Sequence, residues 1–104
     1  MAQIVWTKPA LKDLELIINY IALDSLRYAE RVGREIVCAP RILQDYPQTG
    51  RIVPEFNLAT IRELIYGSYR IIYEIRGNEC HIEAIIHSSR DLMRYYKPGE
   101  WDII

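Results

Sequence analysis

Lysine is scarce in this chain, and positive charge is not in excess. Only three residues are Lys against ten Arg, and 13 basic residues stand against 14 acidic ones, for a net charge of −1. This balance argues against a protein coated with positive potential for nucleic acid, although it leaves room for a local basic patch. The preference for Arg, whose planar guanidinium pairs with phosphate and carboxylate, indicates specific pairing more than general solvation.

Cysteine and long apolar runs are also sparse. The two cysteines, Cys38 and Cys80, are far apart and form no CxxC pair, so we expect free thiols in a reducing cytoplasm. No stretch approaches the roughly 18 apolar residues of a membrane span, and the first residues lack the basic start and apolar run of a signal peptide. The sequence therefore predicts a cytoplasmic protein without a membrane partner.

Length and composition predict a single domain over residues 1–104. Half of the 104 residues are apolar and 26% are charged. This is an ordinary globular composition, which excludes disordered, collagenous and membrane chains. The chain shows no internal repeat and no low-complexity segment.

The first half of the chain predicts a short strand followed by two helices. Residues 4–6 are a β-branched and aromatic run, and Thr7 precedes a Lys-Pro pair of the kind that first helical turns tolerate. Apolar residues at helical spacing predict a helix through about Ala22. Asp24-Ser25 then offers caps for a second helix, in which Pro40 should kink the helix or split off a last turn.

The second half predicts three strands joined by tight turns, over residues 61–65, 69–75 and 80–87. Helices come first and hairpin-linked strands follow, which is the order of an α+β fold. We therefore predict an N-terminal strand and an antiparallel helical hairpin packed on a twisted antiparallel β-sheet. The pattern does not fix where the first strand joins the sheet.

Strand alternation assigns side chains to the two faces of this sheet. Apolar residues at alternate positions of 71–75 and of 82–86 should lie under the helices. The opposite face would then present Arg70 and His87, with Arg90 just beyond the strand end. An open cationic sheet face is the part of the sequence most like a functional site.

Two kinds of role compete for these residues. Arg70, His87 and Arg90 could bind phosphate or carboxylate, but each Arg could equally pair with a neighbouring Glu. Tyr95 and Tyr96 could stack on bases or supply a phenol for proton transfer, whereas packing over the sheet edge is the more common role of such residues.

Metal and cofactor chemistry is disfavoured. His81, Glu83 and His87 share one face of a straight strand, but the two histidines would stand roughly 20 Å apart. No Ser–His–Asp, GxSxG or P-loop pattern is present. We expect no metal and no cofactor, and we expect the Arg62-Glu63 pair to form an internal salt bridge.

Short strings of the sequence, taken in order, resemble the RelE/ParE superfamily of type II toxins. They are TKPALKDL at 7–14, GRIVPE at 50–55, IREL at 61–64, YRIIY at 69–73 and HSSRDL at 87–92. No single string is specific, but together they span nearly the whole chain in the family's order. The resemblance implies the α+β fold described above and an antitoxin, encoded beside the toxin, that holds it inactive.

The resemblance implies different roles for the same residues in the two branches of the superfamily. A RelE-like toxin cleaves mRNA in the ribosomal A site, with Arg70 and Arg90 stabilising the phosphate charge and Tyr96 or His87 moving the proton. A ParE-like toxin poisons DNA gyrase and is not known as a nuclease. In that branch Arg70, His87, Arg90, Tyr95 and Tyr96 would form the surface that binds the target.

The ParE-like branch is favoured. The lysine-rich stretch that a RelE-like toxin carries before its second strand is missing, and Arg51 and Arg62 are the only basic residues between Gly50 and Tyr69. A net charge of −1 also suits a ribosome binder poorly. A RelE-like mRNA endonuclease and a non-toxic interaction domain of the same fold remain the alternatives.

The C-terminal residues are the expected contacts for the antitoxin. Trp101, Ile103 and Ile104 make the tail apolar. Burial of such side chains against a partner would stabilise a hetero-oligomer of toxin and antitoxin.

Overall fold

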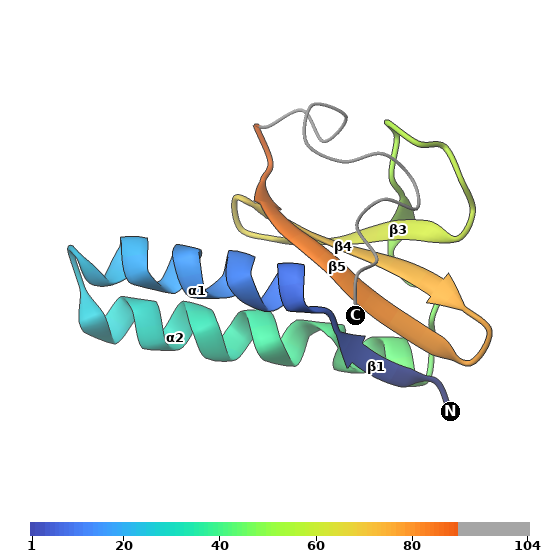
Figure 1. Cartoon of the computed structure of the whole chain (residues 1–104), viewed down its shortest axis with the longest axis horizontal. Helices are drawn as coiled ribbons and strands as arrows, with labels where there is room; N and C mark the ends of the chain where they lie inside the picture. The colour runs from blue at the N-terminus through green and yellow to red at the C-terminus, as the bar shows by residue number, and fades with distance from the viewer. Residues whose placement is uncertain (90–104) are drawn as a thin grey trace.

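Helices and strands form two layers, with a helical hairpin on one face of a twisted sheet (Figure 1). The structure, a computed structural model, describes residues 1–89. The elements in chain order are β1 (Gln3–Trp6), α1 (Lys8–Ala22), α2 (Leu26–Cys38), a 3₁₀ helix η1 (Ala39–Gln44), β2 (Arg51–Ile52), β3 (Ile61–Tyr66), β4 (Tyr69–Arg76) and β5 (Glu79–His87). Within this range no helix is long and apolar enough to cross a bilayer.

The five strands lie in the order β1-β5-β4-β3-β2. β1 runs parallel to β5, with Gln3 opposite Glu79, and the other neighbours are antiparallel. The α+β prediction is confirmed, and the three predicted strands β3, β4 and β5 are antiparallel; β1, whose place the sequence pattern did not fix, joins β5 in parallel. Strand β2 was not predicted, since two residues are too short to show an alternation.

Side-chain caps mark the start of both helices, and a proline marks the end of the second. The Thr7 hydroxyl accepts a hydrogen bond from the Ala10 amide and donates one to the Ile82 carbonyl at 2.7 Å, so it caps α1 and ties it to β5. The Ser25 hydroxyl caps α2 by accepting from the Tyr28 amide. As expected, the regular α2 helix ends just before Pro40, and the chain continues as η1, which contains this proline.

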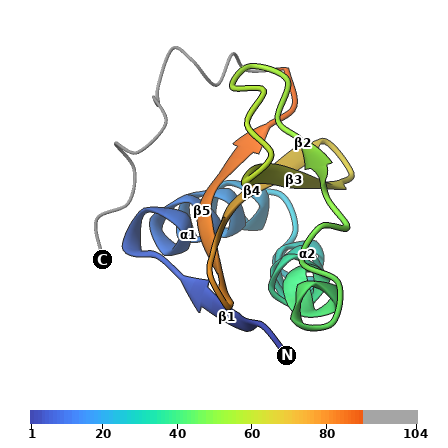
Figure 2. The same cartoon turned by 90° about the vertical axis from the view of Figure 1, so that its right-hand side faces the viewer.

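The core between the layers is built from both helices and from the sheet face beneath them. Its buried side chains from β4 and β5 include Ile71, Tyr73 and Ile82, each without exposed surface. The opposite sheet face is covered as well. Figure 2 shows the segment between β2 and β3 rising beyond the sheet, away from α2. Val53 of this segment forms a second cluster with Ile72, and Phe56 packs against that cluster.

A β-bulge in β5 changes which face of the sheet the side chains of this strand occupy, compared with the simple alternation that the sequence predicts. Ile72 lies opposite Ala84 while Tyr73 lies opposite Ile82, which leaves Glu83 as an extra residue. Beyond the bulge the side chains exchange faces, so Ile82 packs under the helices but Ala84 packs in the second cluster. The predicted common face for residues 82, 84 and 86 is therefore wrong, because all three are apolar and their pattern hides the bulge.

Asp13 of α1 provides a hydrogen-bond acceptor for an amide at the edge of β5, beyond the end of β1. Its carboxylate accepts a hydrogen bond from the Ile85 amide at 3.0 Å, and burial raises the pKa of the Asp13 carboxyl despite that bond. Asp13→Ala should lower the free energy of unfolding by about 1–2 kcal/mol, because it leaves a part-buried amide without an acceptor. Asp13→Asn, which keeps an acceptor oxygen, should lose less in urea denaturation, and equal losses would contradict this role.

Candidate functional site

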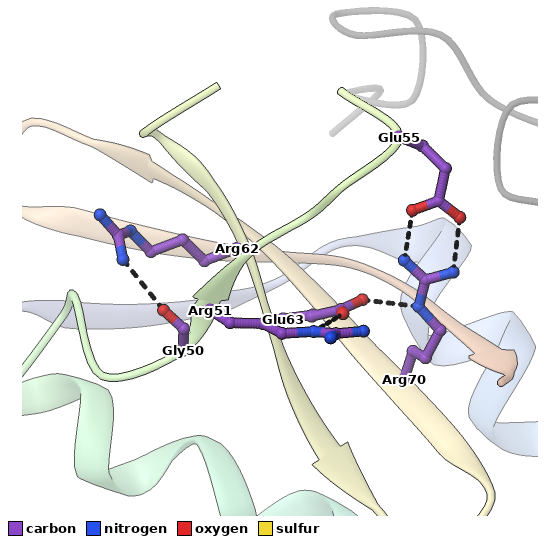
Figure 3. A network of polar contacts seen from close by, with 6 residues as sticks. All are labelled: Gly50, Arg51, Glu55, Arg62, Glu63 and Arg70. Atoms are coloured by element: carbon purple, nitrogen blue, oxygen red, sulfur yellow. Dashed lines mark hydrogen bonds and ion pairs between the residues drawn. The ribbon is translucent and has the colours of Figure 1, made fainter. Parts of the chain in front are cut away.

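Arg70 is the centre of a polar network on the sheet face away from the helices (Figure 3). Its Nη1 and Nη2 donate to the two carboxylate oxygens of Glu55, each at 2.7 Å, and its Nε donates to Glu63 Oε1 at 2.6 Å. Only 5% of Arg70 is exposed. The guanidinium is therefore held on two sides by carboxylates and shielded from water.

Glu63 joins Arg70 to a second arginine. Its side chain, on β3, has no exposed surface, and its other carboxylate oxygen accepts from Arg51 Nε. Arg51 and Glu63 face each other across the β2–β3 pair, which explains why this two-residue strand forms where it does. The network of Glu55, Arg70, Glu63 and Arg51, hereafter the Arg70 network, holds two positive and two negative charges and so carries no net charge.

The segment that delivers Glu55 and Arg51 is fixed to the sheet by its backbone. Arg62 donates from Nη1 to the Gly50 carbonyl at 3.0 Å and from Nε to the Ala59 carbonyl at 2.8 Å. The Tyr73 hydroxyl donates to the Pro47 carbonyl and accepts from the Gly50 amide. A Cβ on Gly50 would lie 2.6 Å from the Glu63 carbonyl oxygen, so only glycine allows this approach.

This geometry corrects the sequence-based prediction for Arg70. The prediction of an open cationic face is wrong, because Glu55 and Glu63 neutralise the guanidinium and the 53–57 segment covers the face beside it. Hydrogen bonding to Glu55 in the first place raises the pKa of Arg70 above its already high ordinary value, even though burial opposes it. An incoming phosphate would have to displace a bidentate carboxylate.

His87 does not join Arg70. It lies opposite Tyr69 on the helix side of the sheet, exposed, with its ring edge-to-face with Tyr69 at a centroid distance of 5.8 Å. Arg70 lies opposite Ile86 on the other side. The bulge at Glu83 separates the two residues that a straight strand would have placed together.

The other predicted site residues lie outside the described residues 1–89. They are the target-binding or catalytic residues Arg90, Tyr95 and Tyr96 and the antitoxin-contacting residues Trp101, Ile103 and Ile104. Their roles stay predictions.

The sequence-based expectation of a salt bridge between Arg62 and Glu63 is wrong. Neighbours in a strand point to opposite faces, and Glu63 instead pairs with Arg51 and Arg70, while Arg62 binds backbone carbonyls. Glu55 was missed as a site residue, although the Pro-Glu string at 54–55 was part of the family resemblance.

Glu83, at the bulge, is a second buried carboxyl, which the sequence pattern had placed beside His81 and His87 on one face of a straight strand. It has no exposed surface, and within residues 1–89 neither of its oxygens has a hydrogen-bond partner. Burial, with a smaller effect from Glu74, raises the pKa of Glu83 to about 7. Among the described residues no group of His, Cys, Asp and Glu is arranged to hold a metal ion.

Comparisons with known proteins agree with this architecture. The family described as the ParE toxin of the type II toxin–antitoxin system parDE matches residues 4–92. Toxin RelE2 of Caulobacter vibrioides is 38% identical over 91 residues, covering 86% of this chain and 99% of that protein. A solved structure, the chromosomal ParDE TA system from P. aeruginosa, has the same fold, with a TM-score of 0.70 at 24% identity, covering 84% of this chain and 96% of the other. The family match includes every residue of the Arg70 network.

Proposed function

The chain belongs to the ParE toxin family of type II toxin–antitoxin systems, and we propose that it arrests growth by poisoning DNA gyrase instead of cleaving RNA. As a toxin of such a system it has a cognate antitoxin as its partner. Gyrase as the target, action in the cytoplasm where gyrase meets DNA, and the absence of catalysis by the toxin itself are parts of the proposal.

The observation that carries the proposal is the sequestration of Arg70. RNA cleavage builds negative charge on the phosphorus, and a nuclease of this fold needs donors aimed at that charge and free to bind it. Here the guanidinium is bound bidentately by Glu55 and again by Glu63. The Arg70 network is neutral, so it adds no positive potential for a phosphate.

The separation of His87, a candidate for proton transfer, from Arg70 supports the same conclusion. His87 lies on the opposite face of the sheet from Arg70. A general acid or base must come within hydrogen-bond reach of the atom whose charge is stabilised nearby. Three lysines in the whole chain and a net charge of −1 also give little attraction for ribosomal RNA.

The proposal is tested with purified gyrase, supercoiled plasmid and the toxin. We expect trapped gyrase–DNA cleavage complexes, visible as linear plasmid after detergent and protease, and we expect the cognate antitoxin to prevent them. A toxin that leaves gyrase untouched while it arrests growth in cells would contradict the proposal. No arrest at all would favour a non-toxic interaction domain of the same fold.

Tyr96→Phe separates the two branches of the superfamily. If the toxin only binds gyrase, no proton is transferred, and loss of one hydroxyl should leave poisoning within about twofold of wild type, whereas loss of a general acid or base typically costs 10²-fold or more. The measurement is the toxin concentration that gives half-maximal plasmid linearisation. Abolished activity in a folded Tyr96→Phe protein would contradict a pure binding mechanism.

A further inference from the structure

Polar side chains of β5 are buried on the sheet face away from the helices. Glu83 belongs to this face, because the charges that act on it are those of Glu74 and Arg76 of β4. These two residues face away from the helices, since Tyr73 beside Glu74 points into the core under the helices. His81 lies opposite Glu74 and shares its face. The surface formed by Glu74, His81 and Glu83 is hereafter the Glu83 patch.

The helices and strands of residues 1–89 do not explain the burial of the Glu83 patch. His81 is 7% exposed and Glu83 has no exposed surface. Within the described range β5 packs mainly against β4 and β1, which flank it in the sheet, and against α1, which lies on the other face. The segment 53–57 covers the same face as the patch, but further along, over Ile72 and Ile86.

The chain continues beyond β5 with enough residues to return over the patch. The Ser88 amide donates to the Ser68 carbonyl at 2.7 Å, which fixes this end of β5 beside the β3–β4 turn. Glu83 lies six residues before Ser89, about 20 Å back along the strand. Residues 90–104 can span about 50 Å when extended. A segment that turns back along β5 therefore brings the residues at positions 95 and 96 level with Glu83.

The composition of residues 90–104 suits such a position. The apolar residues of this segment are Leu92, Met93, Tyr95, Tyr96, Trp101, Ile103 and Ile104. A tyrosine buries about 150–250 Å² and also offers a hydroxyl, which matches a patch that contains a carboxyl and an imidazole. A segment of the same chain is present at an effective concentration of about millimolar, so it is favoured over a separate partner of equal intrinsic affinity.

We infer that residues 90–104 fold back over the Glu83 patch, with Tyr95 and Tyr96 against Glu83. The carboxyl is then enclosed between the sheet and the segment, which explains why it has no exposed surface. Folding back also holds two residues predicted to bind the target on the sheet instead of on a free tail. The inference goes beyond the proposed function and does not depend on it, since the contact requires neither gyrase nor antitoxin.

The test is carboxyl labelling of the full-length protein with a carbodiimide and glycinamide, followed by peptide mass spectrometry. Glu30, which is exposed on α2, is the reference carboxylate. The tail variant is Tyr95→Ser/Tyr96→Ser, which leaves residues 1–89 unchanged.

The matched control removes two tyrosines from the helices instead. It is Tyr20→Ser/Tyr28→Ser, at positions that are 74% and 54% exposed. Circular dichroism verifies that each variant is folded before it is labelled.

In wild type Glu83 should be labelled at least about tenfold more slowly than Glu30, as for an undocked form populated at about 10% or less. In the tail variant the rate at Glu83 should rise toward that of Glu30, whereas the control should keep the wild-type protection. Equal rates at Glu83 and Glu30 in wild type would overturn the inference. Full protection of Glu83 in a folded tail variant would also overturn it, since residues 1–89 would then bury the carboxyl alone.

Dilution distinguishes the chain's own segment from that of a second copy. Protection of Glu83 that stays constant with protein concentration supports a contact within one chain. Protection that is lost on dilution would overturn the inference and assign the cover to a second copy. Because labelling is measured without gyrase, a wild-type protein that fails to poison gyrase but protects Glu83 would contradict the proposed target and leave this inference standing.

Discussion

Replacing Arg70 by Ala should lower the free energy of unfolding by about 3–5 kcal/mol, which is the cost of removing one partner from a buried ion pair. Arg70 is 5% exposed, and the Glu63 carboxylate that it binds has no exposed surface. The substitution would leave Glu63 charged and buried, with Arg51 as its ion-pair partner among residues 1–89, and would remove the bidentate contact between Arg70 and Glu55. Urea or thermal denaturation measures the loss.

Arg51→Ala is the matched control, because Arg51 binds the same carboxylate from an exposed position, with 61% of its side chain accessible. Arg70 still neutralises Glu63 in this control, and most of the Arg51 side chain lies in solvent, so the loss should be about 0–1 kcal/mol. The double replacement Arg70→Met/Glu63→Leu should recover much of the loss, since it removes the stranded charge. An Arg70→Ala protein of wild-type stability would contradict the structural role assigned to Arg70.

Replacing Glu83 by Gln should remove a pH dependence from the stability of the protein. The pKa of Glu83 is about 7 in the fold and 4.5 as the ordinary value, because the carboxyl is buried without a partner among the described residues. Glu74, with a smaller effect, raises this pKa further, and Arg76, which binds Glu74, lowers it. The folded protein therefore favours the protonated form of Glu83.

The sign of the effect follows from linkage. Below about pH 4.5 the folded and unfolded chains both hold the proton, whereas between pH 4.5 and 7 only the folded chain keeps it, so stability falls as pH rises through this window. Relative to Glu83→Gln, wild type should lose about 2–3 kcal/mol between pH 4.5 and pH 8. Chemical denaturation of both proteins across this range gives the difference.

Glu30→Gln serves as the control for this titration. Glu30 is exposed on α2, so Glu30→Gln removes a carboxylate of the same type from the surface. The Glu30→Gln protein should keep the fall in stability that Glu83 causes. A Glu83→Gln curve parallel to wild type would show that Glu83 does not hold its proton in the fold.

The elements of the fold were largely predictable because their signals are local. Thr7 and Ser25 mark helix starts by side-chain caps, and Pro40 ends α2 by removing an amide donor. The parallel pairing of β1 with β5 was not predictable, since both edges of the sheet were open to a first strand. The bulge at Glu83 was also hidden, because apolar residues lie on both sides of it.

The candidate site was predicted less well than the fold, for a physical reason. Sequence places Arg70 on the correct face of β4, but whether an arginine is free depends on which carboxylates the loops bring to it. Glu55 arrives from a segment 15 residues earlier, and Glu63 from the adjacent strand. The alternative that each Arg pairs with a neighbouring Glu is confirmed for Arg70.

The measurement that tests the central claim most directly compares two activities of one toxin preparation. Gyrase with supercoiled plasmid and ribosomes with mRNA are incubated in parallel, and cleaved DNA and cleaved mRNA are quantified at matched toxin concentrations. The Arg70 network leaves no free guanidinium to stabilise the negative charge that develops on the phosphate during RNA cleavage. We therefore expect linear plasmid and intact mRNA. Ribosome-dependent mRNA cleavage by wild type, lost in a folded Arg70→Lys protein, with gyrase unaffected, would contradict the account.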